Sequence, residues 1–91
     1  MNDANLLIGA LSNDLFRVAT LVQRGSTEGA TCFLIEAKRW TQTLQKMKMV
    51  EYIQQIVNDI DTVKLEPISL AMAEKLLMYG VLLQNYTLYN R

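Results

Sequence analysis

Histidine is absent from this 91-residue sequence, which removes much of the enzyme chemistry open to a small protein. Without an imidazole there is no Ser-His-Asp or Cys-His nucleophilic site, no histidine acid–base catalysis and no nitrogen ligand of the usual kind for a metal. Phosphotransfer through histidine is excluded as well. Cys32 is the single cysteine, so an intramolecular disulfide is impossible and a zinc site would need carboxylates or a second subunit.

A charge excess of either sign is also missing. Nine Lys and Arg balance nine Asp and Glu, so the net charge is zero and binding to bulk nucleic acid is not expected. No apolar run approaches the length of a membrane span, and the first residues lack the positive segment of a signal peptide. We therefore expect no membrane contact and, by default, a cytoplasmic location.

Acidic pairs at the spacing of a catalytic or metal site are lacking too. The closest pair, Asp59 and Asp61, would point about 200° apart around a helix. Di-iron bundles need Glu-x-x-His, which cannot occur here. We predict no catalytic, cofactor-binding or metal-binding residues, no cofactor, and a protein that is not an enzyme.

Apolar residues are plentiful, at 51% of the chain, and they recur with a helical period. The spacing of Leu7, Leu11, Leu15, Val18 and Val22 is that of one helix face, which Arg24 and Gly25 should end. Similar apolar stripes recur in three later segments, and Pro67 indicates a loop before the last of them. The sequence predicts an all-α protein, a compact up-down bundle of about four helices in the single domain 1–91, with helices near 5–24, 27–47, 49–63 and 68–89.

Neither glycine nor proline separates the second helix from the third. The stripe that ends at Leu44 would continue onto Lys48 and Glu51, whereas the next apolar residues lie on another face. We therefore predict a kink or a tight turn near 47–49, leaving open whether there are two helices or one kinked helix. The helix at 68–89 is the most densely apolar and should be the most buried. Gly80 within it is expected to admit a neighbouring helix closely.

Three features allow a functional and a structural interpretation. Asp14 lies beside Leu11 on the apolar side of its helix; either it reaches water at the edge of the stripe, which we favour, or it is a buried acid near Arg17. Cys32 is interpreted as a packing residue rather than a reactive thiol. Residues 31–48 carry a net charge of +3 from Lys38, Arg39, Lys46 and Lys48 less Glu36. This basic stretch is either a patch for anionic ligands or, as we favour, a solvated face.

The C-terminal stretch 86–91 contains two tyrosines and a leucine, which suggests docking onto a second chain or onto the bundle itself. Our leading hypothesis is a non-enzymatic helical interaction or adaptor module that self-associates as a homodimer or binds another protein. Its alternatives are a small bundle that binds an apolar ligand between the second and fourth helices, and an accessory helical subunit of an enzyme complex. The candidate interface residues are Trp40, Met78, Leu82, Tyr86 and Tyr89.

Overall fold

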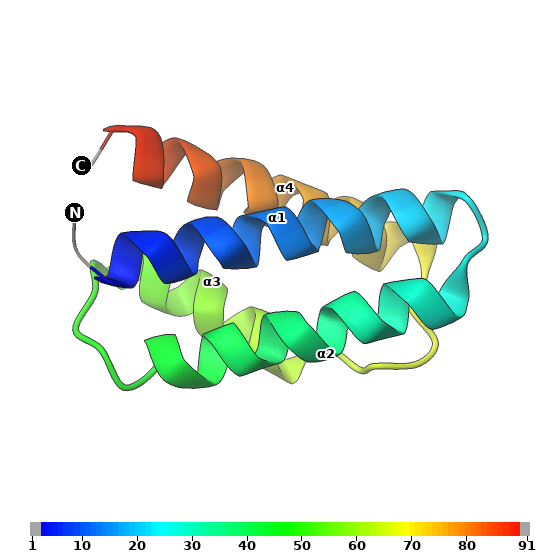
Figure 1. Cartoon of the computed structure of the whole chain (residues 1–91), viewed down its shortest axis with the longest axis horizontal. Helices are drawn as coiled ribbons and strands as arrows, with labels where there is room; N and C mark the ends of the chain where they lie inside the picture. The colour runs from blue at the N-terminus through cyan, green and yellow to red at the C-terminus, as the bar shows by residue number, and fades with distance from the viewer. Residues whose placement is uncertain (1–2, 90–91) are drawn as a thin grey trace.

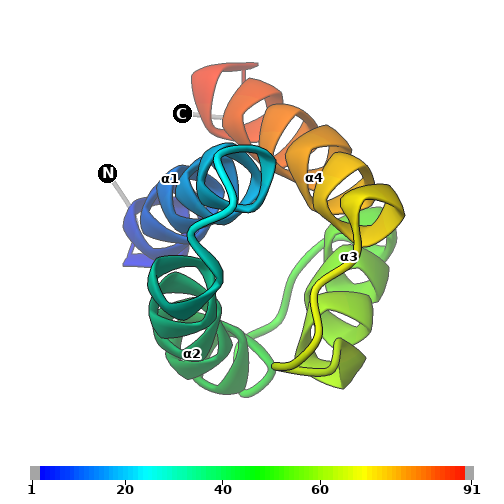
Figure 2. The same cartoon turned by 90° about the vertical axis from the view of Figure 1, so that its right-hand side faces the viewer.

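A computed structural model describes residues 3–89, and within that range the chain forms four helices and no strands. They are α1 (Asp3–Gln23), α2 (Thr27–Leu44), α3 (Glu51–Thr62) and α4 (Leu70–Tyr89). Successive helices run in opposite directions (Figure 1), and α4 returns beside α1 to close the ring (Figure 2). The predicted all-α up-down bundle of four helices is confirmed.

The turn between α1 and α2 has the hydrogen bonds of a glycine-terminated helix. Gly25 has a φ of 79°, the left-handed conformation that glycine adopts without a steric penalty. Its N–H donates to the carbonyl of Val22 at 3.0 Å, and the N–H of Ser26 donates to that of Leu21 at 2.9 Å. This pair of bonds is the Schellman motif, so the stop predicted at Arg24 and Gly25 is confirmed.

The break that was predicted without glycine or proline is a true connection between two helices. α2 ends at Leu44, residues 45–50 form an irregular link, and α3 begins at Glu51. The chain reverses its direction across this link (Figure 1). Because of that reversal, Leu44 and Ile53 both lie in the core with no exposed surface, although their stripes would face different sides of one straight helix.

The core is centred on α1 rather than on α4. Seven residues of α1 are buried, against four of α4: Ala73, Leu76, Gly80 and Leu83. α1 packs against both α2 and α4, whereas the twelve-residue α3 contacts its two neighbours over a much smaller area. The prediction that the fourth helix is the most buried is therefore wrong, because one long neighbour and one short neighbour cannot cover its whole circumference.

Gly80 lies on the side of α4 that packs against α1. A Cβ atom at this position would stand 2.9 Å from Cε1 of Phe16, closer than real contacts allow. The hydroxyl of Ser12 donates to the carbonyl of Gly80 at 2.8 Å, so the missing side chain admits both an aromatic ring and a hydrogen bond. The role predicted for this glycine is confirmed.

The space between α2 and α4 is occupied by side chains. The two helices stand at opposite corners of the ring (Figure 2). Leu34 and Leu44 of α2 and Leu76 and Leu83 of α4 belong to one core cluster, and none of the four has exposed surface. An apolar ligand would therefore have to displace core side chains to bind there.

Candidate functional site

The outward side of α4 is apolar, although it faces away from the core. Ala73, Leu76, Gly80 and Leu83 recur at steps of three and four, and this stripe packs inward. Leu77 follows Leu76 by one residue, which turns its side chain about 100° away. Leu70, Leu77, Val81 and Leu88 then form a second stripe at steps of seven, four and seven, so α4 carries one apolar stripe more than the bundle buries.

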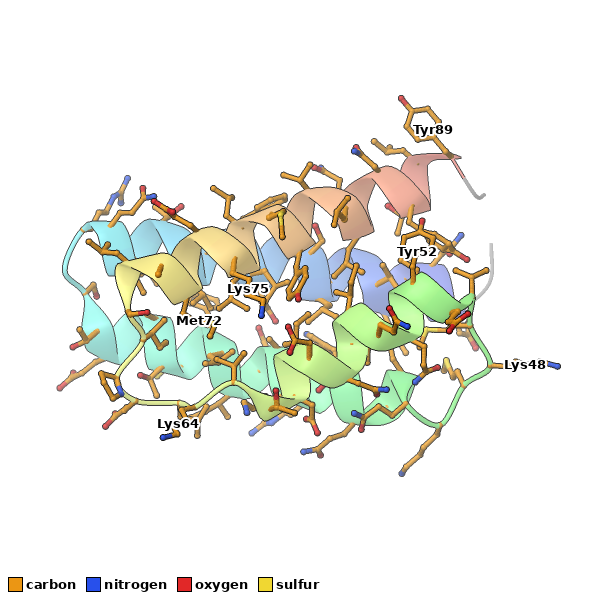
Figure 3. All side chains as sticks on the ribbon, turned by 180° about the vertical axis from the view of Figure 1, so that it is seen from behind. Lys48, Tyr52, Lys64, Met72, Lys75 and Tyr89 are labelled. Atoms are coloured by element: carbon orange, nitrogen blue, oxygen red, sulfur yellow. The ribbon has the colours of Figure 1, made fainter. Side chains whose placement is uncertain are left out.

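This second stripe and its flank make up the largest exposed apolar surface on any one helix. We call it the α4 face; its exposed members are Leu70, Leu77, Met78, Val81, Leu82, Leu88 and Tyr89. Exposure ranges from 37% at Leu77 to 83% at Tyr89. Figure 3 shows the ring of Tyr89 projecting away from the bundle. Contiguous apolar patches of more than a few hundred Å² are unusual on monomers and mark sites of association.

The structure brings three of the five predicted interface residues together. Met78, Leu82 and Tyr89 lie on the α4 face. Tyr86 instead turns toward α3, where its ring meets that of Tyr52 edge to face at 6.0 Å between centroids. Trp40 lies on α2, and its indole N–H donates a hydrogen bond to Asp14 of the same chain.

Of the other four members of the α4 face, Leu88 belongs to the C-terminal stretch for which docking was predicted, whereas Leu70, Leu77 and Val81 were missed. The spacing of seven, four and seven that links the four was visible in the sequence. We had interpreted it as part of one wide buried surface, because a periodic pattern cannot show which of two apolar stripes finds a partner.

A polar cluster between α3 and α4 fixes how α4 is turned about its own axis. The hydroxyl of Tyr79 donates to Oδ2 of Asp59, and Nζ of Lys75 lies 3.0 Å from the same oxygen. The hydrogen bond from Tyr79, followed by the one from Lys75, lowers the pKa of Asp59. Burial, followed by the hydrogen bond to Asp59, raises the pKa of Tyr79. With Tyr79 and Lys75 held against α3, the α4 face is directed outward; Lys75 can be seen between the two helices in Figure 3.

Asp14 is buried, so the favoured prediction that it reaches water is wrong. Its residue surface is 3% exposed, and its Oδ2 accepts a hydrogen bond of 2.9 Å from Nε1 of Trp40. The carboxyl of Glu36 on α2 also hydrogen-bonds to it. Burial first, then this second carboxyl, raises the pKa of Asp14 from 3.8 to about 6, while Trp40 and the positive charge of Arg17 act in the opposite direction. The cluster ties α1 to α2 through a group that titrates near neutral pH.

Cys32 is exposed on α2, so its interpretation as a packing residue is wrong. Within the basic stretch, Lys38 donates to the backbone carbonyl of Asp61 at 2.9 Å and thereby joins α2 to α3. Lys46 and Lys48 are solvent-exposed in the link 45–50, as the solvated-face interpretation predicts; Lys48 projects from this end of the bundle in Figure 3.

Two negative findings concern residues 3–89. No three acidic, histidine or cysteine side chains in this range gather closely enough to hold a metal ion. None of the four helices, taken over the same residues, has both the length and the apolar content that crossing a bilayer requires.

Comparison of the chain with protein-family models, with curated proteins and with solved structures gives no match. The α4 face and the side chains around it are therefore the features that bear on function.

Proposed function

We propose that this protein is a non-enzymatic interaction module that forms a homodimer through the α4 face. The observation that carries the proposal is a whole helix side of large apolar residues left without a partner, from Leu70 to Tyr89. At about 150–200 Å² for a fully exposed large side chain, the exposed fractions amount to roughly 550–730 Å² per protomer. A standard stable interface buries about 800 Å² per partner, so this face is close to the required size.

The pattern of the α4 face favours a second copy as the occupant. The spacing of Leu70, Leu77, Val81 and Leu88 reads the same in both directions. If two α4 helices pair antiparallel about a two-fold axis, Leu70 lies opposite the partner's Leu88, and Leu77 lies opposite the partner's Val81. Such self-complementarity is what a two-fold interface requires.

Charge supports the same arrangement. Between Leu70 and Leu77, Glu74 is the charged residue on the side of α4 that carries this stripe, since Lys75 turns toward α3. In the antiparallel pair it lies opposite the neutral amide of the partner's Gln84, whereas in a parallel pair two Glu74 carboxylates would meet and repel. The zero net charge of the chain removes long-range repulsion between copies.

Val81→Glu tests the interface near its centre. Val81 is 44% exposed, so the fold should tolerate the change, but the dimer would bury two carboxylates close to its axis. We expect a dimer at micromolar concentration for the wild type in equilibrium sedimentation and at least a tenfold weaker association for the variant. Val50→Glu is the matched control, because Val50 is 47% exposed on the start of α3 and should leave the dimer unchanged. A wild-type monomer throughout the concentration series would rule out the proposal.

The orientation of the pair can be tested by cross-linking in a Cys32→Ser background. Proteins carrying Leu70→Cys or Leu88→Cys alone should react poorly with a short bismaleimide, because like positions lie at opposite ends of an antiparallel pair. A mixture of the two should give a cross-linked heterodimer. Efficient cross-linking of either protein with itself would instead indicate a parallel pair and contradict the two-fold arrangement described here.

A further inference from the structure

A second surface, on the other side of α1, is built from different chemistry. Two hollows share the side chain of Phe33: one lies between α1 and α2, and the other, next to it, is lined by residues of α2 alone. One, of about 370 Å³, is lined by Arg17 and Arg24 together with apolar side chains. The other, of about 260 Å³, is lined by Cys32, Ile35, Glu36 and Arg39 of α2, so that it holds one acid beside its arginine. We call the two hollows together the α1–α2 groove.

Among residues 3–89 no carboxylate lies within 4.0 Å of a groove arginine, although the charge of Arg17 acts on Asp14 from further away. Across that range the one ion pair within 4.0 Å joins Lys75 to Asp59, far from the groove. The guanidinium of Arg17 lies over the ring of Phe33, with its carbon 5.1 Å from the centroid. A guanidinium held over an aromatic face keeps the N–H donors around its edge free for a carboxylate. Arg17 is thus positioned by a contact that leaves its hydrogen-bonding capacity unused.

The spacing of Arg17 and Arg24 defines the ligand. Arg17 lies in α1, and Arg24 directly follows its last residue, Gln23. The N–H of Arg24 still donates to the carbonyl of Thr20 at 3.1 Å, so the two arginines, seven residues apart, lie on one side of the helix about 10 Å apart along its axis. Two carboxylates seven residues apart on another helix have the same separation. Between the arginines the floor of the hollow is apolar, formed by Phe16, Leu21 and Phe33, and it suits the apolar side chains between two such acids.

From this complementarity we propose that the α1–α2 groove docks an acidic amphipathic helix of a different protein, whose two carboxylates bind Arg17 and Arg24. A second copy of this chain does not fit the groove, because none of its four helices carries two acidic residues seven positions apart. The proposal is independent of the dimer, since the α4 face and the groove share no residue.

Fluorescence anisotropy with labelled, end-capped, alanine-based helical peptides tests the proposal. The probe carries two glutamates seven positions apart with leucines between them. One comparison peptide has lysines in place of the glutamates, and another has the glutamates five positions apart. We expect the probe to bind the wild-type protein at least about tenfold more tightly than either, and to weaken as salt is added. Equal binding of the glutamate and lysine peptides would overturn the proposal.

Charge reversal supplies the matched controls. Arg17→Glu with Arg24→Glu should weaken the glutamate probe at least about tenfold and make the lysine peptide the better ligand. Lys46→Glu with Lys48→Glu changes the net charge equally at the far end of the bundle and should leave binding unchanged. Unaltered probe binding by the arginine double variant would refute the proposal, as would binding of a single-stranded oligonucleotide as tightly as the probe. The arginine double variant should sediment as the wild type does, which would show that its loss of peptide binding does not come from a change in the dimer.

Discussion

Replacing Asp14 by asparagine is expected to stabilise the protein at pH 7 by about 1–3 kcal/mol. Asp14 is 3% exposed, and burial foremost, then the hydrogen bond with Glu36, raises the pKa of its carboxyl from 3.8 to about 6. A shift of this size corresponds to at most about 3 kcal/mol of free energy that the ionised form costs the folded state. Asparagine keeps the shape, accepts the hydrogen bond from Trp40 and offers an N–H to Glu36, but it buries no charge.

The free energy of unfolding should depend on pH in the same sense, because ionised Asp14 destabilises the folded state. Between pH 4 and about 6 the folded state holds a proton on Asp14 that the unfolded state has lost. The free energy of unfolding should therefore fall as pH rises through this window and level off above it, as far as this group is concerned. In Asp14→Asn this component disappears. Urea unfolding followed by circular dichroism at several pH values would show it, with the exposed loop acid replaced in Glu66→Gln as the control. A variant less stable than the wild type at pH 7 would contradict this account.

Most of the fold could be predicted from the sequence because its signals are local. Helix periods, the Arg24–Gly25 stop and the rotation of the stripe after Leu44 depend only on neighbouring residues. The end of α2 and the start of α3 nevertheless differ from the prediction, by three residues and by two. Met47 and Met49 extended the apolar pattern, but they lie partly buried in the link between the two helices.

The candidate site was harder to predict because exposure depends on which helices meet. Leu77 and Leu76 are both leucines in one apolar helix, yet the first is 37% exposed and the second has no exposed surface. Which of the two leucines is buried depends on where α1 and the short α3 lie against α4. Asp14 illustrates the same limit: its neighbours along α1 indicated the edge of a stripe, whereas Trp40 and Glu36, from 22 to 26 residues further along the chain, enclose it.

The α1–α2 groove shows that the net charge of a sequence does not reveal where its charges gather in the structure. The chain is neutral as a whole, and the basic excess that the sequence displayed lay in residues 31–48. In the structure Lys38 is engaged with α3, while Arg39 of α2 lines a hollow next to the one that is lined by Arg17 of α1 and by Arg24 of the turn after it. A local positive surface therefore forms from residues that are distant in the sequence, and net charge gives no indication of it.

Trp40→Phe is expected to destabilise the protein at pH 7 by about 2–4 kcal/mol. The indole N–H donates a hydrogen bond of 2.9 Å to Oδ2 of Asp14. Hydrogen bonds to charged groups contribute about 1.5–3 kcal/mol. The smaller ring also loses some packing against the core, which Trp40 borders. Since this hydrogen bond lowers the pKa of Asp14, its loss should raise that pKa above about 6 and extend the pH-dependent window upward.

A double-mutant cycle separates the hydrogen bond from the packing. In the Asp14→Asn background the acceptor is neutral, so Trp40→Phe should cost about 1–2 kcal/mol less there than in the wild type, whereas a pure packing loss would be the same in both. Circular dichroism again provides the signal, because the variant lacks the chain's one tryptophan. Equal costs in the two backgrounds would show that Trp40 acts through its volume alone. A reduced cost would show that the indole N–H stabilises a buried charge in the joint between α1 and α2.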